Sequence, residues 1–363
     1  MAHSYYGSEE VSRPWYSKKR VWTAVAVILL IVIVVPVAVT VSKEKQKENR
    51  YPNYSKLNYT LLETYAGETF FDKFTYFTGY DPANGHVHYV PRETAAQYNL
   101  TYASNTNTSV LKVDTTVGPG SNPDASTGRF SVRVESTNQY EVNTLFVFSI
   151  LHTPYGCGTW PALWLSDPRS DVWPANGEID VFEATNLGNT GNQASLHTTK
   201  NCDMSGVKRK MTGTAGNLDC YNGTENTGCG VGGGVSTFGE KFNDGGGGVM
   251  AVEWREEGIR MWMFGNGETL PAGLGNETTE TMPDPSAWGE AWADFPGTDC
   301  DIDAHFRNQS IIANIDLCGD LTEAKWDTSG CGSSTCVDYV SDNPDAFVDA
   351  YWEFESFKIY KAQ

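Results

Sequence analysis

The chain has 363 residues, of which 40% are hydrophobic, enough for the core of one large β domain or two ordinary domains. Its 18 Tyr, 16 Phe, 11 Trp and 36 Gly favour strands and tight turns over long helices. The formal net charge of −19 argues against a nucleic-acid partner, because phosphates are bound by Lys and Arg.

The N-terminal region differs from the rest in charge and in hydrophobicity. Residues 1–50 carry 8 Lys and Arg against 4 Glu, and residues 21–41 (VWTAVAVILLIVIVVPVAVTV) carry no charge. A helix of this length spans about 30 Å, the thickness of a bilayer core. The alternative is a cleaved signal peptide, whose hydrophobic region is usually shorter, about 7–15 residues. We therefore predict a cytoplasmic tail at residues 1–20 and a transmembrane signal anchor at Val21–Val41.

The cysteines and glycosylation motifs predict the orientation of this anchor, since the basic residues on its two sides are equal in number. All 8 cysteines follow it, an even number that predicts disulfides, and no CxxC pair indicates zinc. Asn-x-Ser/Thr sequons also follow it, at Asn53, Asn58, Asn99, Asn107, Asn222, Asn276 and Asn308. We predict a single-pass type II membrane protein whose C-terminal part is lumenal or extracellular.

After the anchor, residues 42–67 are polar and predict a stalk. From residue 68 onward, short hydrophobic or alternating runs are separated by turn residues, as in RFSVRVES, where Phe130, Val132 and Val134 share one face. No run has helical periodicity, and strands do not alternate with helices. We predict one all-β domain at residues 68–363, a sandwich or jelly roll. Nothing in the sequence determines an oligomeric state.

One expected strand, GEIDVFEATN, carries three acidic residues. On a regular strand Glu178 and Asp180 share a face and Glu183 points away. One extra residue at a β-bulge around Val181 and Phe182 would return Glu183 to that face. Neighbouring carboxylates raise one another's pKa, so one member of such a group can hold a proton while another stays ionised. This is the equipment of a retaining glycosidase, whose two carboxyls stand about 5–5.5 Å apart.

Other interpretations of these acids stay open on spacing alone. They are consistent with a solvated strand face, or with a calcium site built from carboxylate oxygens. Nearby Trp160, Trp164 and Trp173 favour a sugar site, because sugar rings stack on aromatic rings. Two further histidines, in GHVHYV, share a strand face as two zinc ligands would, but no third ligand is in sight.

The order of several motifs resembles glycoside hydrolase family 16, in its fungal laminarinase-like endo-β-1,3(4)-glucanase form. The similar stretches run from FFDKFTYFTGYDPANGHVHYV through GRFSVRVES, HTPYGCGTWPALWL, GEIDVFEATN, QASLHTTKNC, AVEWREEGIRMW and SIIANIDLCGD to YWEFESFKIY. The resemblance covers about residues 65–361. It implies a β-jelly-roll with a concave cleft, hydrolysis of β-1,3 or mixed β-1,3-1,4 glucan, and no required cofactor, while a structural calcium ion stays compatible with it.

The resemblance also implies roles for individual residues. Glu178 matches the nucleophile, Asp180 the residue that orients it, and Glu183 the acid/base. Six further residues match substrate-contacting positions with less specificity: Trp160, Trp173, His197, Arg133, Trp254 and Asn314. The anchor departs from secreted family members and resembles membrane-bound relatives in wall glucan assembly. The alternatives are therefore a glucan transglycosylase and a low-turnover glycan-binding protein.

Overall fold

The computed structural model describes residues 14–17, 19–48, 51–118, 120–121, 127–169, 171–223, 227–275 and 281–363. These residues belong to two compact units, Met1–Arg50 and Tyr51–Gln363. The first unit contains a short 3₁₀ helix, η1 (Trp15–Ser17), and the helix α1 (Lys19–Glu48). The second unit contains every strand that the structure describes.

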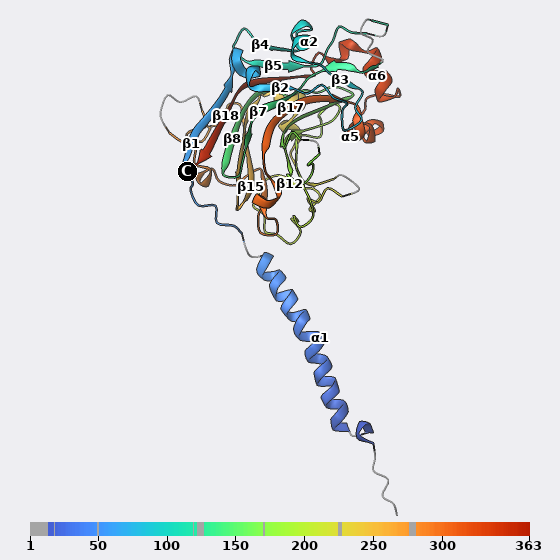
Figure 1. Ribbon diagram of the computed structural model, residues 1–363, viewed down its shortest axis with the longest axis vertical. Helices are drawn as coiled ribbons and strands as arrows, with labels where there is room; N and C mark the ends of the chain where they lie inside the picture. Colours follow the sequence, from blue (N-terminus) through green and yellow to red (C-terminus); the bar gives the residue numbers. More distant parts are fainter. Residues whose placement is uncertain are drawn as a thin grey trace, which may run out of the picture. The chain divides into compact units, whose positions relative to one another are not determined.

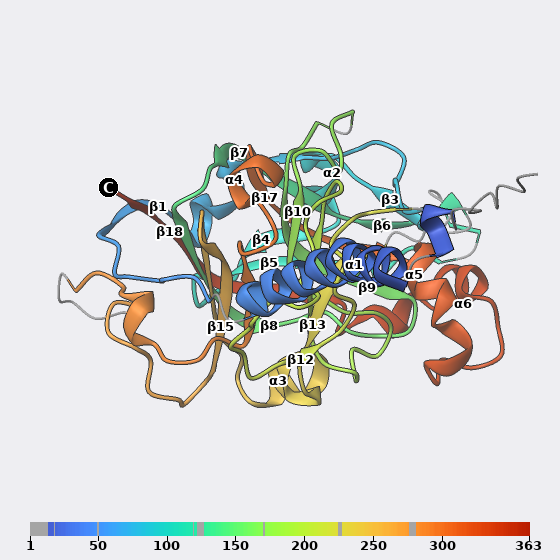
Figure 2. The same ribbon diagram turned by 90° about the horizontal axis from the view of Figure 1, so that it is seen from below.

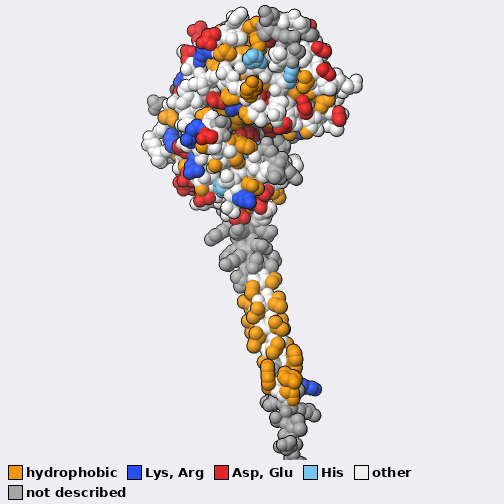
Figure 3. Space-filling model, turned by 45° about the vertical axis from the view of Figure 1, so that its right-hand side comes forward, with side chains coloured by type: hydrophobic (Ala, Val, Ile, Leu, Met, Phe, Trp, Pro, Cys, Tyr) orange, Lys and Arg blue, Asp and Glu red, His pale blue; other side chains and the backbone are white. Residues whose placement is uncertain are grey.

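Helix α1 includes the segment predicted as a membrane anchor. Its described side chains are mostly hydrophobic and exposed (Figure 3). The helix runs from Lys19 to Glu48 and so extends beyond both ends of the segment Val21–Val41 that the sequence predicts as the anchor. Among the residues that the structure describes, no helix combines the length and hydrophobicity needed to cross a membrane.

The second unit is built on two large antiparallel sheets (Figures 1 and 2). Sheet A has the order β16-β15-β14-β8-β18-β5-β4, with β1 also paired to β18. Its strands are β1 (Tyr59–Ala66), β4 (Thr101–Ala103), β5 (Ser109–Lys112), β8 (Thr144–His152), β14 (Gly248–Arg255), β15 (Gly258–Gly265), β16 (Ala293–Pro296) and β18 (Tyr351–Ala362). The C-terminal strand β18 thus lies inside the sheet, between β8 and β5.

Sheet B has the order β12-β13-β11-β10-β9-β17-β7-β2. Its strands are β2 (Phe74–Tyr76), β7 (Arg133–Tyr140), β9 (Thr159–Ser166), β10 (Glu178–Glu183), β11 (Gln193–His197), β12 (Thr214–Ala215), β13 (Cys229–Gly232) and β17 (Gln309–Leu317). A separate parallel pair is formed by β3 (Val87–Tyr89) and β6 (Arg129–Ser131). The acidic strand β10 therefore lies near the middle of sheet B.

One hydrophobic core contains residues from both sheets, as in a β-sandwich. The ring of Phe182 in β10 packs edge-on against Trp352 of β18, with 6.1 Å between centroids. Trp352 also donates its indole N–H to the backbone oxygen of Asn314 in β17, at 3.1 Å. These contacts join the two sheets behind the acidic strand. The prediction of an all-β, jelly-roll-like domain is confirmed.

Short helices lie in the connections between the strands. They are η2 (Gly67–Lys73), α2 (Arg92–Gln97), η4 (Val235–Thr237), α3 (Gly239–Asp244), η5 (Pro285–Ala287), α4 (Ile302–His305), α5 (Gly319–Ala324), η6 (Trp326–Thr328), α6 (Cys336–Asp342) and η7 (Pro344–Phe347). Helices α5 and α6 lie together at one end of the domain in both ribbon views (Figures 1 and 2). The disulfide Cys318–Cys336 joins their N-termini.

All eight cysteines form disulfides, as the even count predicted. The pairs are Cys157–Cys331, Cys202–Cys300, Cys220–Cys229 and Cys318–Cys336. Two of them span 174 and 98 residues of sequence and so close long loops of the unfolded chain. The pairing follows from which loops and helix ends meet in the fold, and the spacing of the cysteines does not reveal it.

The predicted stalk at residues 42–67 is wrong over its C-terminal part. Strand β1 pairs with β18 along its whole length, from Tyr59 opposite Ala362 to Ala66 opposite Ser356. The register shifts between Leu61 and Glu63, so the side chains of β1 do not alternate regularly between buried and exposed. This bulge removes the two-residue period by which a strand is recognised in sequence.

Candidate active site

The acidic strand β10 contains the bulge that its spacing predicted. Along β9, Asp180 lies opposite Trp164, whereas Phe182 lies opposite the adjacent residue Leu163. The register therefore shifts between Asp180 and Phe182, with Val181 as the extra residue. Val181 and Phe182 are both buried, with 0% and 1% of their surfaces exposed. The predicted β-bulge is confirmed.

The bulge places the acids on one face of sheet B. Asp180 pairs with Trp164 and Glu183 with Ala162, and these two β9 residues are two apart and share a face. Glu178 lies two residues before Asp180 on the regular part of β10 and shares its face for the same reason. We call this the acidic face of sheet B, defined by Glu178, Asp180 and Glu183.

Glu178 receives a hydrogen bond from Trp173, which lies in the loop before β10. The indole N–H donates to Oε2 of Glu178 at 2.7 Å, and the ring of Trp173 is 39% exposed. Burial raises the pKa of Glu178, while His197 and the Trp173 hydrogen bond act in the opposite direction by favouring the ionised form. Glu178 is thus a partly desolvated carboxyl with a fixed orientation.

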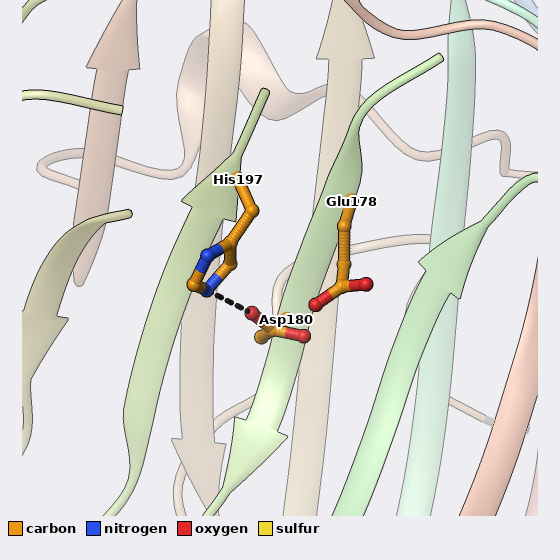
Figure 4. A group of neighbouring side chains, drawn as sticks. All are labelled: Glu178, Asp180 and His197. Atoms are coloured by element: carbon orange, nitrogen blue, oxygen red, sulfur yellow. Dashed lines mark ion pairs between the residues drawn. The ribbon is translucent and has the colours of Figure 1, made fainter. Parts of the chain in front are cut away.

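Asp180 forms an ion pair with His197 on the adjacent strand β11, where Nε2 of the imidazole lies 3.3 Å from Oδ2 (Figure 4). Burial, and next the charge of Glu178, raises the pKa of Asp180 to about 8. Burial opposes protonation of His197, but Asp180 outweighs it and raises the pKa of the imidazole to about 10. At neutral pH these residues together hold more protons than the same groups would in water.

Glu178, Asp180 and His197 offer ligand atoms within 4.8 Å of one another, a spacing that a metal ion can bridge. Coordination by histidine requires a neutral imidazole with a free lone pair. The pKa of His197 is raised to about 10, so its imidazole is protonated at neutral pH. A metal ion at this trio would have to displace the proton of His197.

Glu183 is held by Trp160, whose indole N–H donates to Oε1 at 2.9 Å. Its backbone is held by Asn192, which the sequence did not single out. Oδ1 of Asn192 accepts from the backbone N–H of Glu183 at 3.0 Å, and its amide nitrogen donates to the carbonyl of Val181 at 2.9 Å. Asn192 is 1% exposed, so it supplies partners for backbone groups that the bulge removes from the strand ladder.

A row of side chains crosses the acidic face from Glu183. Glu183 lies opposite Ala162, Ala162 opposite Asn314, and Asn314 opposite Arg133 on β7. Adjacent strands are about 4.8 Å apart, so this row extends roughly 14 Å from the acid. Arg133 lies over the Trp164 ring at 4.9 Å, and the indole N–H of Trp164 donates to Asn314 at 2.8 Å. Two of the residues predicted to bind substrate, Arg133 and Asn314, are therefore on the acidic face.

The prediction for Trp254 is wrong. This residue is 0% exposed in the hydrophobic core, on strand β14 of the opposite sheet. Its neighbour Glu253 points the other way, into a buried cluster in which it accepts hydrogen bonds from Tyr59 and Arg260. In an alternating strand, one face is expected to be exposed to solvent and the other buried. Here both faces of the strand are buried, since Glu253 is 1% and Trp254 is 0% exposed. Trp164, which the sequence places near the acids but not among the six substrate-contacting positions, lies on the acidic face.

A family model described as XgeA-like, catalytic GH16 domain matches residues 74–360. The chain belongs to glycoside hydrolase family 16. A probable glycosidase of Schizosaccharomyces pombe is 40% identical to it over 318 residues, covering 86% of this chain and 72% of the relative. The endo-1,3(4)-β-glucanase xgeA of Emericella nidulans is 36% identical, covering 84% of this chain and 47% of the relative. The chain thus spans about half the length of this glucanase.

Solved structures of family 16 enzymes share the fold. Laminarinase 16A from Phanerochaete chrysosporium, solved with β-glucans in its donor and acceptor sites, is 39% identical with a TM-score of 0.77. It covers 84% of this chain and 99% of its own. An elongating family 16 β-1,3-glucosyltransferase is 35% identical with a TM-score of 0.75, covering 84% of this chain and 100% of its own. The resemblance to laminarinase-like members of family 16 is confirmed.

Proposed function

We propose that this protein is a retaining endo-β-glucanase that hydrolyses β-1,3 or mixed β-1,3-1,4 glucan. The observation that carries the proposal is the bulge in β10, because it puts Glu178 and Glu183 on one face. Each of these acids accepts a hydrogen bond from its own tryptophan, Trp173 or Trp160. Two separately oriented carboxyls on one surface are what a double-displacement glycosidase requires.

In the first step, the Glu178 carboxylate attacks the anomeric carbon of a bound glucosyl unit. The bond from this carbon to the glycosidic oxygen breaks, and the Glu183 carboxyl gives its proton to that oxygen. The charged imidazole of His197, paired with Asp180, places a positive charge beside Glu178, which favours ionisation of Glu178 before the attack. The indole N–H of Trp173 favours the same ionised form.

In the second step, the Glu183 carboxylate takes a proton from water, and the water oxygen bonds to the anomeric carbon. The bond to Glu178 breaks, and the sugar leaves with its original anomeric configuration. Trp160 holds Glu183 through both steps, since its N–H can donate to the carboxyl in either protonation state. Both steps use only side chains of this protein and water, so we propose that no cofactor is required. A structural calcium ion stays compatible with the proposal.

We propose that the glucan lies across the strands along a concave cleft on the acidic face. The partly exposed rings of Trp160, Trp164 and Trp173 offer stacking surfaces for sugar rings. Arg133 lies over the ring of Trp164 and also over the ring of Phe77, at 4.5 Å, so two aromatic rings position its guanidinium. His197 adjoins Glu178 and would contact the sugar nearest the reacting carbon.

Product analysis tests this function. The full chain is incubated with laminarin, lichenan and carboxymethylcellulose, and the products are separated by size. We expect short oligosaccharides from laminarin, from lichenan or from both, and none from carboxymethylcellulose. No product from any β-glucan would overturn the proposal in favour of a glycan-binding protein with little turnover.

A second candidate activity is transfer of the glucosyl group to another glucan. Its support is the similarity to the elongating β-1,3-glucosyltransferase, at 35% identity. In that reaction a sugar hydroxyl replaces water in the second step, and Glu183 takes its proton. Products longer than the substrate laminarioligosaccharide would identify transfer, whereas products that are all shorter support hydrolysis.

We also propose that the protein is a single-pass type II membrane protein with its enzyme domain lumenal or extracellular. The support is the uncharged segment at residues 21–41, together with four disulfides and the sequons that follow it. Of these sequons, Asn276 lies outside the described residues. Peptide-N-glycosidase should lower the apparent mass, and carbonate extraction should leave the chain in the membrane pellet. A mature chain that begins near Val41 would instead identify a cleaved signal peptide.

A further inference from the structure

A loop that no step of the mechanism uses contacts the histidine of the active site. Nδ1 of His197 lies 3.1 Å from Oδ1 of Asn222, while Nε2 on the other side of the ring faces Asp180. The imidazole is therefore bridged between a carboxyl of β10 and an amide of the segment between β12 and β13. His197 has a side chain only 12% exposed, so this bridge is mostly sheltered from water.

Hydrogen bonds anchor the backbone at Asn222. Its N–H donates to the carbonyl of Thr198 at 2.7 Å, and Thr198 in turn donates to the carbonyl of Cys220 at 2.9 Å. The disulfide Cys220–Cys229 then ties this segment to β13, where Cys229 lies opposite Leu196 of the strand that carries the histidine. The amide that meets His197 therefore lies two residues after a cysteine that is tied to β13.

The same loop passes close to the imidazole a second time, at Gly228. This residue has φ +55°, and a Cβ placed on it would lie 2.7 Å from Nδ1 of His197 and 2.5 Å from the carbonyl oxygen of Leu196. Only glycine fits both the left-handed backbone and this space. The ring of His197 is thus confined sterically as well as by hydrogen bonds.

A protonated imidazole donates from both nitrogens and so requires two acceptors. Asp180 is one acceptor, and the amide oxygen of Asn222 is placed to be the other. We propose that Asn222 is a positioning residue of the catalytic centre, which holds His197 in its charged form and in the orientation that faces Asp180 and Glu178. This inference rests on the proposed glucanase function for its effect on turnover.

The groups around His197 show how Asn222 contributes to stabilising the protonated imidazole. Asp180, Glu178 and Glu183, all on β10, stabilise the imidazolium from one side. On the loop side, the imidazole faces the amide oxygen of Asn222. Asn222 contributes an acceptor there without a further negative charge. Replacing it by an apolar residue should lower the pKa of His197, and replacing it by aspartate should raise that pKa.

Asn222 is also the first residue of the sequon Asn222-Gly223-Thr224. A glycan would attach to the amide nitrogen of the same side chain whose oxygen meets His197. The sequence therefore offers a matched control, because Thr224→Ala abolishes the sequon and leaves the amide intact. Asn222→Ala removes both features, and Asn222→Asp removes the sequon while retaining an acceptor of the same size.

The test compares these three variants with the wild-type full chain, all made in one glycosylating host. We measure kcat and KM on laminarin, and the pKa of His197 by NMR titration of its ring. Asn222→Ala should lower kcat about tenfold, change KM less, and lower the pKa of His197. Asn222→Asp should recover much of kcat and raise that pKa, and Thr224→Ala should match the wild type in both.

Two results would overturn the inference. One is an Asn222→Ala variant with the kcat and His197 pKa of the wild type. The other is a Thr224→Ala variant that loses as much activity as Asn222→Ala, which would assign the effect to the glycan or to Thr224. The NMR titration needs no substrate, so it separates this inference from the proposed function. A wild type without activity on β-glucans, but with the expected pKa changes, would contradict only the function.

Discussion

Trp160 and Glu183 lie on adjacent strands, and the indole N–H of Trp160 donates to the carboxyl at 2.9 Å. Such a bond fixes the direction in which the carboxyl presents its proton. Trp173 does the same for Glu178, from a loop and not from a strand. The two acids are thus oriented independently, and each orientation can be tested by removing one N–H.

We predict that Trp160→Phe lowers kcat on laminarin about tenfold and changes KM less. Phenylalanine keeps an aromatic surface but loses the donor, and a hydrogen bond to a charged group is worth about 1.5–3 kcal/mol. Trp164→Phe is the matched control, because its indole N–H donates to Asn314 and not to an acid. Steady-state kinetics on both variants checks this. Equal loss of kcat in the two would show that ring shape, and not the bond to Glu183, is what matters.

Asn192 should stabilise the bulge and, through it, the position of Glu183. Asn192→Ala leaves the N–H of Glu183 and the carbonyl of Val181 without these partners, at a cost of about 2–4 kcal/mol in the free energy of unfolding. It should also lower kcat by about tenfold. Denaturant titration and kinetics measure the two effects.

The control for Asn192 is a variant that destabilises the core away from the site. Ile150→Val in sheet A should lower the free energy of unfolding by about 1 kcal/mol and leave kcat unchanged. Asn192→Asp keeps the acceptor for Glu183 but loses the donor to Val181, so its activity should lie between those of Asn192→Ala and the wild type. Wild-type kcat in folded Asn192→Ala would contradict the role of this residue.

The bulge itself could be predicted from the sequence, because two acids on an alternating pattern and a third one residue out of step leave few other ways to share a face. The role of Asn192 in supporting the bulge could not be predicted from the sequence. Asn192 precedes a strand, where an asparagine ordinarily indicates a turn. Its two hydrogen bonds exist only because β11 returns beside β10, and no local pattern reports that proximity.

The errors at Trp254 and at residues 59–66 also have physical causes. Alternation identifies two faces of a strand but not which one packs in the core. At Trp254 both faces are buried, since Glu253 lies in a network with Tyr59 and Arg260. In residues 59–66 the register shift breaks the alternation, and the pairing with a strand almost 300 residues away supplies the structure instead.

The raised pKa values of Asp180 and His197 predict how the stability of the fold depends on pH. Both groups have a pKa that folding raises, to about 8 and about 10, so the folded state binds more protons than the unfolded state. Stability should therefore fall as the pH rises from 6 to 9. Asp180→Asn removes one of these groups and the main partner that raises the pKa of the other. It should flatten the dependence of Tm on pH over this range.

Asp167→Asn is the control for this pH effect. The Asp167 carboxyl is also partly buried, but hydrogen bonds from Arg169 and Asn176 outweigh burial and lower its pKa to about 2. It stays ionised from pH 6 to 9 and binds no proton there in either state. Its loss should lower Tm by a similar amount at each pH. A Tm profile that is steeper in Asp180→Asn than in the wild type would contradict the proton assignment.

The roles of the two outer acids are tested most directly by azide rescue of their alanine variants, with the anomeric configuration of the glycosyl azide read by NMR. An activated aryl β-laminaribioside is the substrate, because its leaving group needs little protonation. With Glu178→Ala, azide should enter the space of the missing nucleophile and give the inverted product. With Glu183→Ala, the covalent intermediate should still form on Glu178, and azide should attack it to give the retained product. The opposite assignment of products would mean that the two roles are reversed, and wild-type rates on laminarin in both variants would show that the acidic face is not the active site.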